Sequence, residues 1–170
     1  MKLSIRKMTL EDIPAVVDLD RKSFSLPWPE RSFRFEITEN EMARCWVADL
    51  DGRVVGMIVV WLIVDEAHVA TLAANPDYRR QGIAKRLLAH ALLHLSEEGA
   101  RTSFLEVREN NLPAQEMYRK FGYEVTGRRR RYYSDNDEDA ILMTLNSLEP
   151  ERLLFFEKER SPLDKEEQNE

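Results

Sequence analysis

The stretch that decides the fold is NPDYRRQGIAKRLLAHALLHLSEEG, residues 75–99. Pro76 ends an apolar strand pattern and opens a short turn that contains Gly82. After this turn, apolar residues recur at the spacing of one helix face: Ile83, Ala84, Leu87, Leu88, Ala91, Leu92 and Leu95. Gly99 is typical of the position just past a helix end. The stretch therefore predicts the end of a strand, a turn and a long amphipathic helix.

The start of this predicted helix is strongly basic, with no acid between Asp77 and Glu97. Its four cations are Arg79, Arg80, Lys85 and Arg86. A helix N-terminus already carries partial positive charge and unpaired N–H groups, so bases there are unfavourable unless an anion is supplied from outside. Gly82 would let a bulky anion approach the backbone. On charge alone, a phosphate site and a solvated basic patch both fit the pattern.

Strand and helix patterns alternate along the rest of the chain. Strands are predicted at 2–8, in three segments within 43–75 that include an Asp51-Gly52 hairpin turn, and at 102–108, 123–127 and 138–148. A capping box of Thr9 and Asp12 opens a helix, and further helices are predicted at 30–38 and 110–122. Strands that both precede and alternate with helices indicate a mixed α/β sheet with helices on its faces.

The composition is that of one globular domain. The chain has 170 residues, 43% of them apolar, and a formal net charge of −6. This acidity argues against nucleic acid as a partner, and no apolar run is long enough for a membrane span. A single cysteine, Cys45, and the lack of a signal-peptide pattern predict a cytoplasmic protein. From residue 149 the composition shifts, which divides the chain into a domain at 1–148 and a helix or strap with a charged tail at 149–170.

Two common phosphate motifs do not fit the basic turn. The dinucleotide fingerprint needs three glycines, and the P-loop needs Gly-Lys followed by Ser or Thr. What remains is Arg79-x-x-Gly82-x-Ala84 after a strand ending in TLAANPDYR. This motif resembles the acyl-CoA pyrophosphate loop of the GNAT superfamily, the Gcn5-related N-acetyltransferases. Ala84 stands where that family more often has glycine, and Ala74 where it more often has valine.

A second stretch, FLEVRENNLPAQEMYRKFGYE at 104–124, resembles the later GNAT segment in which a strand leads to a helix ending in Tyr-x-x-x-Gly-Tyr. Together with FSLPWPERSF and GRRRRYYSDNDEDAILMTL, it resembles the RimI branch over residues 3–146. The resemblance implies a GNAT fold, with a mixed, mostly antiparallel sheet of about seven strands and about four helices. It also implies acetyl-CoA as co-substrate, no metal, and a protein N-terminal α-amine as acceptor, with a ribosomal-protein alanine as first choice.

The resemblance assigns two catalytic roles. Glu106 corresponds to the general base, acting through water, whereas the residues alone equally allow an outward-facing acid on an exposed strand. Tyr118 corresponds to the general acid that protonates the leaving thiolate, whereas its helical stripe with Ala114, Met117 and Phe121 also fits a core position. A tyrosine hydroxyl is a donor at neutral pH, as that role requires.

The same resemblance assigns the cofactor-binding residues. Main-chain groups of Leu72, Ala73 and Ala74 would bind the acetyl and pantetheine part, with a splayed or bulged strand freeing N–H groups for the thioester oxygen. Asn111, which could equally be a helix cap, would touch CoA. The pyrophosphate would be held, mainly by backbone, by Arg80, Gln81, Gly82, Ile83, Ala84 and Lys85, with Arg79 opening the motif.

The acceptor would enter between the SLPWPE loop and the turn after the four arginines 128–131. Trp28, Tyr132 and Tyr133 are the candidate peptide contacts.

A monomer or weak homodimer is expected, with LLFF at 153–156 packing back on the domain or forming a dimer contact. Rival functions are acetylation of lysine or a small amine, a non-catalytic CoA-binding module, and nucleotide binding.

Three further features favour ordinary structural roles. Cys45 lies in an apolar strand without a neighbouring histidine, which argues against an acyl-carrying nucleophile. His90 and His94 have i, i+4 spacing but no accompanying zinc motif, which favours a solvated helix face. Arg128 to Arg131, followed by Tyr132 and Tyr133, could contact RNA, but DNDED at 135–139 balances their charge locally, which argues against RNA binding.

Overall fold

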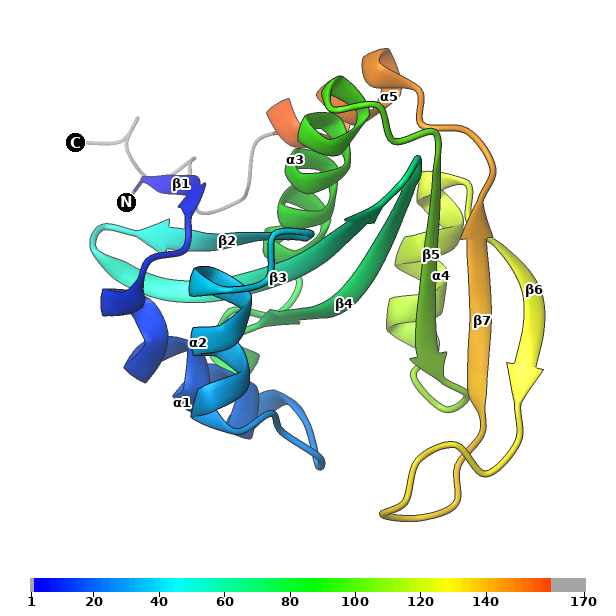
Figure 1. The fold of residues 1–170 in the computed structure, drawn as a ribbon, viewed down its shortest axis with the longest axis horizontal. Coiled ribbons are helices and arrows are strands. Elements are labelled where there is room, and N and C mark those ends of the chain that lie inside the picture. Colours follow the sequence, from blue (N-terminus) through cyan, green and yellow to red (C-terminus); the bar gives the residue numbers. More distant parts are fainter. Residues whose placement is uncertain (1, 160–170) are drawn as a thin grey trace.

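The computed structural model describes residues 2–159, and its centre is one seven-stranded sheet (Figure 1). The order is β1-β2-β3-β4-β5-β7-β6, and only the β4–β5 pair is parallel. This confirms the predicted mixed, mostly antiparallel sheet. The strands are β1 (Leu3–Lys7), β2 (Ala43–Leu50), β3 (Arg53–Ile63), β4 (Glu66–Ala74), β5 (Thr102–Arg108), β6 (Glu124–Arg129) and β7 (Ala140–Leu145).

Helices cover both faces of the sheet. In Figure 1, α1 and α2 lie on one side of the sheet and α3 and α4 on the other. The described part contains five α-helices, one more than the roughly four expected, because the segment after residue 149 is helical. They are α1 (Ile13–Ser23), α2 (Glu30–Thr38), α3 (Ile83–Glu97), α4 (Leu112–Phe121) and α5 (Pro150–Lys158), with short 3-10 helices η1 (Leu10–Asp12) and η2 (Pro76–Tyr78).

Each face of the sheet has its own apolar core. The larger core joins α3, α4 and α5 to the sheet and contains Leu87, Leu92 and Leu105. The smaller core joins α1 and α2 to the other face and contains Val16, Phe33 and Val59. Removal of this apolar surface from water is the main favourable term for the fold. The apolar stripe predicted from Ile83 to Leu95 is the face of α3 that enters the larger core.

Strands β4 and β5 separate soon after they pair. Their parallel ladder joins Glu66 to Thr102, Ala67 to Ser103 and His68 to Phe104, and pairing ends there. On the other edge of β4, Val59 of β3 lies opposite Thr71 and Val60 lies opposite Val69, so Ala70 is an extra, bulged residue. Figure 1 shows the two strands diverging toward the ends that carry the loops. The second half of β4 therefore faces β5 without ladder bonds to it, which is the splayed strand that the sequence analysis anticipated.

Helix α3 approaches the sheet closely at a glycine. A Cβ built on Gly56 of β3 would lie 2.7 Å from Ile83 Cγ2 and 2.9 Å from Leu87 Cδ1. These distances are too short for a real side chain, so glycine at this position lets the first turns of α3 rest on β3. The basic turn before α3 is thereby fixed against the end of β4.

The segment after residue 149 packs on the helices of the larger core. Leu153 is buried, and the Phe156 ring lies 4.6 Å from the Phe121 ring of α4. Arg152 donates to the Lys120 carbonyl at 2.5 Å. Packing against the domain is therefore seen for half of the LLFF segment, whereas Leu154 and Phe155 are exposed. The part of the predicted tail from residue 160 onward lies outside the described residues. No helix within 2–159 is long and apolar enough to cross a membrane.

The close approach at Gly56 yields a first prediction. Gly56→Ala should destabilise the fold by about 1–3 kcal/mol, the usual cost of overpacking, because Ile83 and Leu87 must move away. The loss is measured as the shift in the urea unfolding midpoint. Gly127→Ala is the matched control, since its Cβ would meet only the Leu142 side chain, at 3.1 Å and beyond. Equal destabilisation by the two variants would contradict this account.

Candidate active site

The turn between β4 and α3 is organised by Asn75, a residue that the sequence analysis did not single out. Its side-chain oxygen accepts from the Asp77 N–H at 2.9 Å, and its own N–H donates to the Val55 carbonyl at 2.8 Å. Its carbonyl accepts from the Tyr78 N–H at 2.9 Å. Asn75 is buried and joins the end of β4 to η2. The available signal was the Asn-Pro-Asp order, which is typical of an Asx turn.

The predicted pyrophosphate loop leads directly into α3. Arg80 has φ of 62° and Gly82, the N-cap of α3, has φ of 76°, so both residues are left-handed. A non-glycine residue in this region is uncommon and is typical of a constrained functional loop. The helix starts at once, with the Arg86 N–H donating to the Gly82 carbonyl at 3.0 Å. The N–H groups of Ile83, Ala84 and Lys85 precede the first helical hydrogen bond and have no acceptor within the helix.

The side chains around this loop are not equivalent. Arg79 and Arg80 are exposed, so their guanidinium groups are accessible to an anion. Lys85 instead turns to α5: its ammonium group donates to the Glu159 carboxylate and lies 4.7 Å from the Phe156 ring centroid. The side chain of Lys85 is thus directed toward α5, and the binding of an anion by its backbone stays a prediction. Gln81 is partly buried within the loop.

Strand β4 brings the three candidate acetyl-binding residues to the point where it has left β5. Leu72 lies opposite Ile58, Ala73 opposite Met57 and Ala74 opposite Gly56, so this segment is held by β3 on one edge only. Ala73 is buried. Unpaired strand groups on the other edge are available to a ligand lying between β4 and β5.

Glu106 lies on β5, on the face opposite Leu105 and Val107, which point into the larger core. Its side chain is 30% exposed and pairs with Arg129 of β6, with Oε1 3.3 Å from the Arg129 Nε. A hydrogen bond to Glu106 raises the pKa of Tyr132. The carboxylate thus faces the segment after β6 and is not a solvated surface acid without partners.

Tyr118 lies on the buried face of α4 and is 7% exposed. Its ring meets the Tyr123 ring edge-on at a centroid distance of 5.7 Å. Burial raises the pKa of Tyr118 above its usual value of 10.0, because the tyrosinate form would lose its hydration. The hydroxyl therefore stays protonated at neutral pH. Tyr118 can therefore both pack in the core through its ring and keep a protonated hydroxyl.

Tyr133 is a partly buried residue of the loop between β6 and β7. It is within electrostatic range of both Tyr118 and Glu106. Burial raises the pKa of Tyr133 to about 12, so this hydroxyl also stays protonated at neutral pH. Tyr132 and Tyr133 pack edge-on at 5.1 Å in the loop between β6 and β7. Tyr132 is thus hydrogen-bonded to Glu106, and Tyr133 packs on Tyr132 in the same loop.

The remaining predicted residues lie at the edges of this region. Asn111 is the N-cap of α4, and its side chain accepts from the Ala114 N–H at 3.3 Å, so the capping role is present. Trp28 is partly buried in the α1–α2 loop, where its ring lies 5.3 Å from that of Phe33. Within residues 2–159 no hydrogen bond or ring–ring contact joins Trp28 to Tyr132 or Tyr133. Figure 1 shows the α1–α2 and β6–β7 loops at the same end of the molecule.

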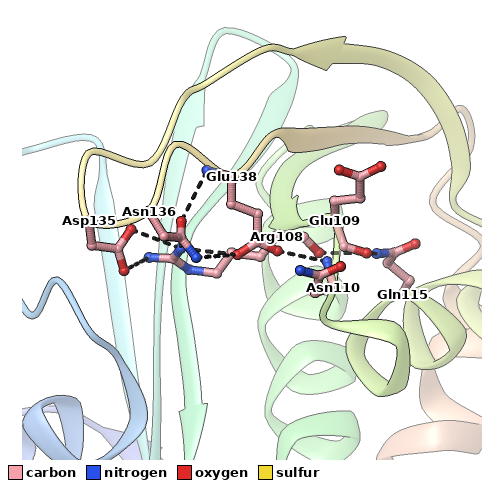
Figure 2. A network of polar contacts seen from close by, with 7 residues as sticks. All are labelled: Arg108, Glu109, Asn110, Gln115, Asp135, Asn136 and Glu138. Atoms are coloured by element: carbon pink, nitrogen blue, oxygen red, sulfur yellow. Dashed lines mark hydrogen bonds and ion pairs between the residues drawn. The ribbon is translucent and has the colours of Figure 1, made fainter.

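Arg108 is the main residue that the sequence analysis missed. Figure 2 shows it at the centre of a polar network that joins β5 to the β6–β7 loop. It contacts Asp135 and Glu138, two members of the DNDED run. That run was expected to balance the four arginines 128–131, yet only Asp139 does so, through its 2.8 Å ion pair with Arg128. The available signal was a cation two residues after Glu106, on the same face of a strand.

The alternative sites are explained by packing. Burial raises the pKa of the Cys45 thiol to about 12, so a reactive thiolate is not formed at neutral pH. His90 is not on a solvated face as expected: it packs against Trp46, and its Nδ1 lies 2.6 Å from Glu157 of α5. In the described part of the chain, no group of three histidine, cysteine or acidic residues could hold a metal ion.

Residues 13–123 match the family model described as Acetyltransferase (GNAT) family. The chain belongs to this family. It is accordingly an N-acetyltransferase with the GNAT fold, which confirms the resemblance drawn from the basic turn and from residues 104–124.

Three proteins illustrate the relationship. A Bacillus subtilis protein, provisionally named [ribosomal protein bS18]-alanine N-acetyltransferase, is 40% identical and aligns with 84% of this chain and 94% of its own length. The crystal structure of the Escherichia coli ribosomal-protein-S18-alanine N-acetyltransferase superposes with a TM-score of 0.79, at 30% identity, covering 87% of this chain and 96% of that one. A Bacillus anthracis protein provisionally described as a streptothricin acetyltransferase, in complex with acetyl coenzyme A, is 25% identical with a TM-score of 0.71, covering 86% of this chain and 99% of that one.

The two buried tyrosines of this GNAT domain predict a specific alkaline instability. Burial raises the pKa values of Tyr118 and Tyr123 in the folded state, whereas an unfolded tyrosine loses its proton near pH ~10. Above that pH the folded state binds more protons than the unfolded state, so stability falls as pH rises. Tyr118→Phe should weaken this fall, measured as urea midpoints at neutral and alkaline pH. Equal pH dependence in wild type and variant would contradict the prediction.

Proposed function

We propose that this protein transfers the acetyl group of acetyl-CoA to the N-terminal α-amine of a protein. The observation that carries the proposal is the separation of β4 from β5 beside two candidate catalytic groups. The free edge of β4 leads into the basic loop at the start of α3. Glu106 lies on the strand that forms the other side of the separation, and Tyr118 on the helix that follows it.

The loop and the free strand edge would hold acetyl-CoA. The first-turn N–H groups of Ile83, Ala84 and Lys85 and the left-handed turn at Arg80 and Gly82 suit a pyrophosphate. Backbone groups of Leu72, Ala73 and Ala74 would bind the pantetheine and polarise the thioester oxygen. Support comes from the Bacillus anthracis relative, whose structure contains acetyl coenzyme A. The proposal includes no metal.

The chemistry requires one proton to leave the amine and one to reach the sulfur. Glu106 would take the proton of the attacking amine through a water molecule, as the amine nitrogen bonds to the thioester carbonyl carbon. As the carbon–sulfur bond breaks, Tyr118 would donate its hydroxyl proton to the leaving thiolate. An N-terminal amine has a pKa near ~8, compared with ~10.4 for lysine, so a carboxylate base suffices for it.

The acceptor is proposed from the names of two relatives. The Bacillus subtilis and Escherichia coli proteins are named for the alanine of ribosomal protein bS18, which favours a protein N-terminus that begins with alanine. The α1–α2 loop with Trp28 and the β6–β7 loop with Tyr132 and Tyr133 would flank its entry. A small amine is the second candidate, because the Bacillus anthracis relative is named for streptothricin.

The proposal also covers the organisation and location of the protein. The catalytic unit would be residues 1–148, and the helix and tail at 149–170 would be an addition to it. The protein would act in the cytoplasm, where ribosomal proteins are made. It would act as a monomer or weak homodimer and would need no nucleic acid. Direct transfer within a ternary complex requires both substrates to be bound together.

The acceptor class is tested with matched peptides. Peptides that begin with alanine and contain one internal lysine should be acetylated by the protein and acetyl-CoA when the N-terminus is free, and not when it is blocked. Mass spectrometry of fragments locates the new acetyl group. Product found only on lysine, or only on a small amine such as streptothricin, would contradict the proposal that the acceptor is an N-terminal α-amine.

The catalytic roles are tested by two conservative changes. Glu106→Gln and Tyr118→Phe should each lower kcat by roughly 10²–10⁴-fold, the range for loss of a general acid or base. Tyr123→Phe is the matched control, because Tyr123 is equally buried but its hydroxyl contacts Ser103 at 2.7 Å. Unchanged turnover in both variants would remove their assigned roles. A wild type that binds CoA without turnover would favour the non-catalytic module.

A further inference from the structure

Arg108 lies two residues beyond Glu106 on β5 and therefore shares its face of the strand. Its side chain is 22% exposed and points toward the loop between β6 and β7, residues 130–139 (Figure 2). This loop carries Tyr132 and Tyr133, which lie beside Glu106. A residue that fixes this loop therefore fixes one side of the proposed acceptor site.

The guanidinium group of Arg108 holds the loop by several bonds. Its two terminal nitrogens donate to the two carboxylate oxygens of Asp135 at 3.1 and 3.0 Å, which is the paired geometry that arginine forms best. One of these nitrogens also lies 3.3 Å from Glu138 and 3.4 Å from the Asn136 side-chain oxygen. Hydrogen bonding by Arg108 lowers the pKa of Asp135, so this carboxylate keeps its charge further into the acid range.

Arg108 also stacks on one of the site tyrosines. Its guanidinium carbon lies 3.9 Å from the centroid of the Tyr133 ring. The loop is closed on itself at this residue, because the Tyr133 N–H donates to the Glu138 carbonyl at 3.2 Å and the Asp137 N–H donates to the Tyr133 carbonyl at 2.9 Å. Tyr133 is thus held by its own turn and by one cation beneath its ring.

The base of this arrangement is joined to α4. The Gln115 amide donates to the carbonyls of Arg108 and Glu109 at 3.1 and 2.8 Å, and Gln115 is buried (Figure 2). Glu138 in turn accepts from the Asn110 N–H at 2.8 Å. The network thus joins the loop to β5 and α4, the two elements that carry Glu106 and Tyr118.

We propose that Arg108 is a positioning residue that holds the β6–β7 loop, and with it Tyr133, over the acceptor side of the site. The inference rests on the proposed function, since it takes this loop to flank the incoming amine. Arg108 touches neither substrate in this account. Its loss should weaken acceptor binding while leaving acetyl-CoA binding nearly unchanged, because that binding is assigned to the free edge of β4 and the loop before α3.

The test compares Arg108→Gln with Arg44→Gln, a matched control. Arg44 forms a similar paired bond with Glu98 at 3.0–3.2 Å, but it joins β2 to the end of α3, remote from the site. Arg108→Gln should raise the KM of the acceptor peptide by about tenfold, the effect of losing one charge-assisted pair, and change the KM of acetyl-CoA by less than about twofold. Arg44→Gln should change neither KM by more than that.

Hydrogen exchange of residues 130–139 provides a readout that does not depend on turnover. Exchange should be faster in Arg108→Gln and unchanged in Arg44→Gln, and Arg108→Lys should lie between wild type and Arg108→Gln because lysine cannot form the paired bond. Asp135→Asn should reproduce part of the effect and add little to Arg108→Gln, because both changes remove the same pair.

Two outcomes would overturn the proposal: unchanged exchange in Arg108→Gln, or faster exchange with an unchanged acceptor KM. If wild type acetylates only lysine or a small amine, the proposed function fails. The same KM comparison is then made with that amine, so that the role of Arg108 is decided separately.

Discussion

The site depends on one constraint, the early separation of two parallel strands. Strands β4 and β5 pair only from Glu66 to His68, and the bulge at Ala70 turns the rest of β4 away. A sheet normally satisfies its backbone groups by pairing, and a strand edge left free inside the protein is available to a ligand. The basic loop, Glu106 and Tyr118 are all arranged around this edge.

Two kinds of packing keep the separation in place. On the α3 side, Gly56 allows the helix to rest on β3, and this contact holds the loop at the end of β4. On the β5 side, Arg108 and Gln115 join the strand to the β6–β7 loop and to α4. Each side of the separation thus has its own support.

Local patterns predicted much of this structure. The periodicity from Ile83 to Leu95 gave α3, and the Thr9 and Asp12 capping box is present, with the Thr9 N–H donating to Asp12 at 2.8 Å. Such signals depend on neighbours within a turn or a strand. The Arg108 network could not be predicted in this way, because its partners Asp135 and Glu138 lie 27 and 30 residues further along the chain. The burial of His90 could not be predicted in this way either, because its partners Trp46 and Glu157 lie on β2 and α5, far from it in the chain.

By itself, the sequence determined the family, the order of strands and helices, and the residue types at the start of α3, because these depend on composition and short-range spacing. The tertiary structure decided which carboxylates meet which arginines, where β4 leaves β5, and that Arg108 stacks on the Tyr133 ring. These are contacts between segments far apart in the chain. They form only when the sheet brings β5, β7 and the connecting loop together, and no local pattern encodes that choice.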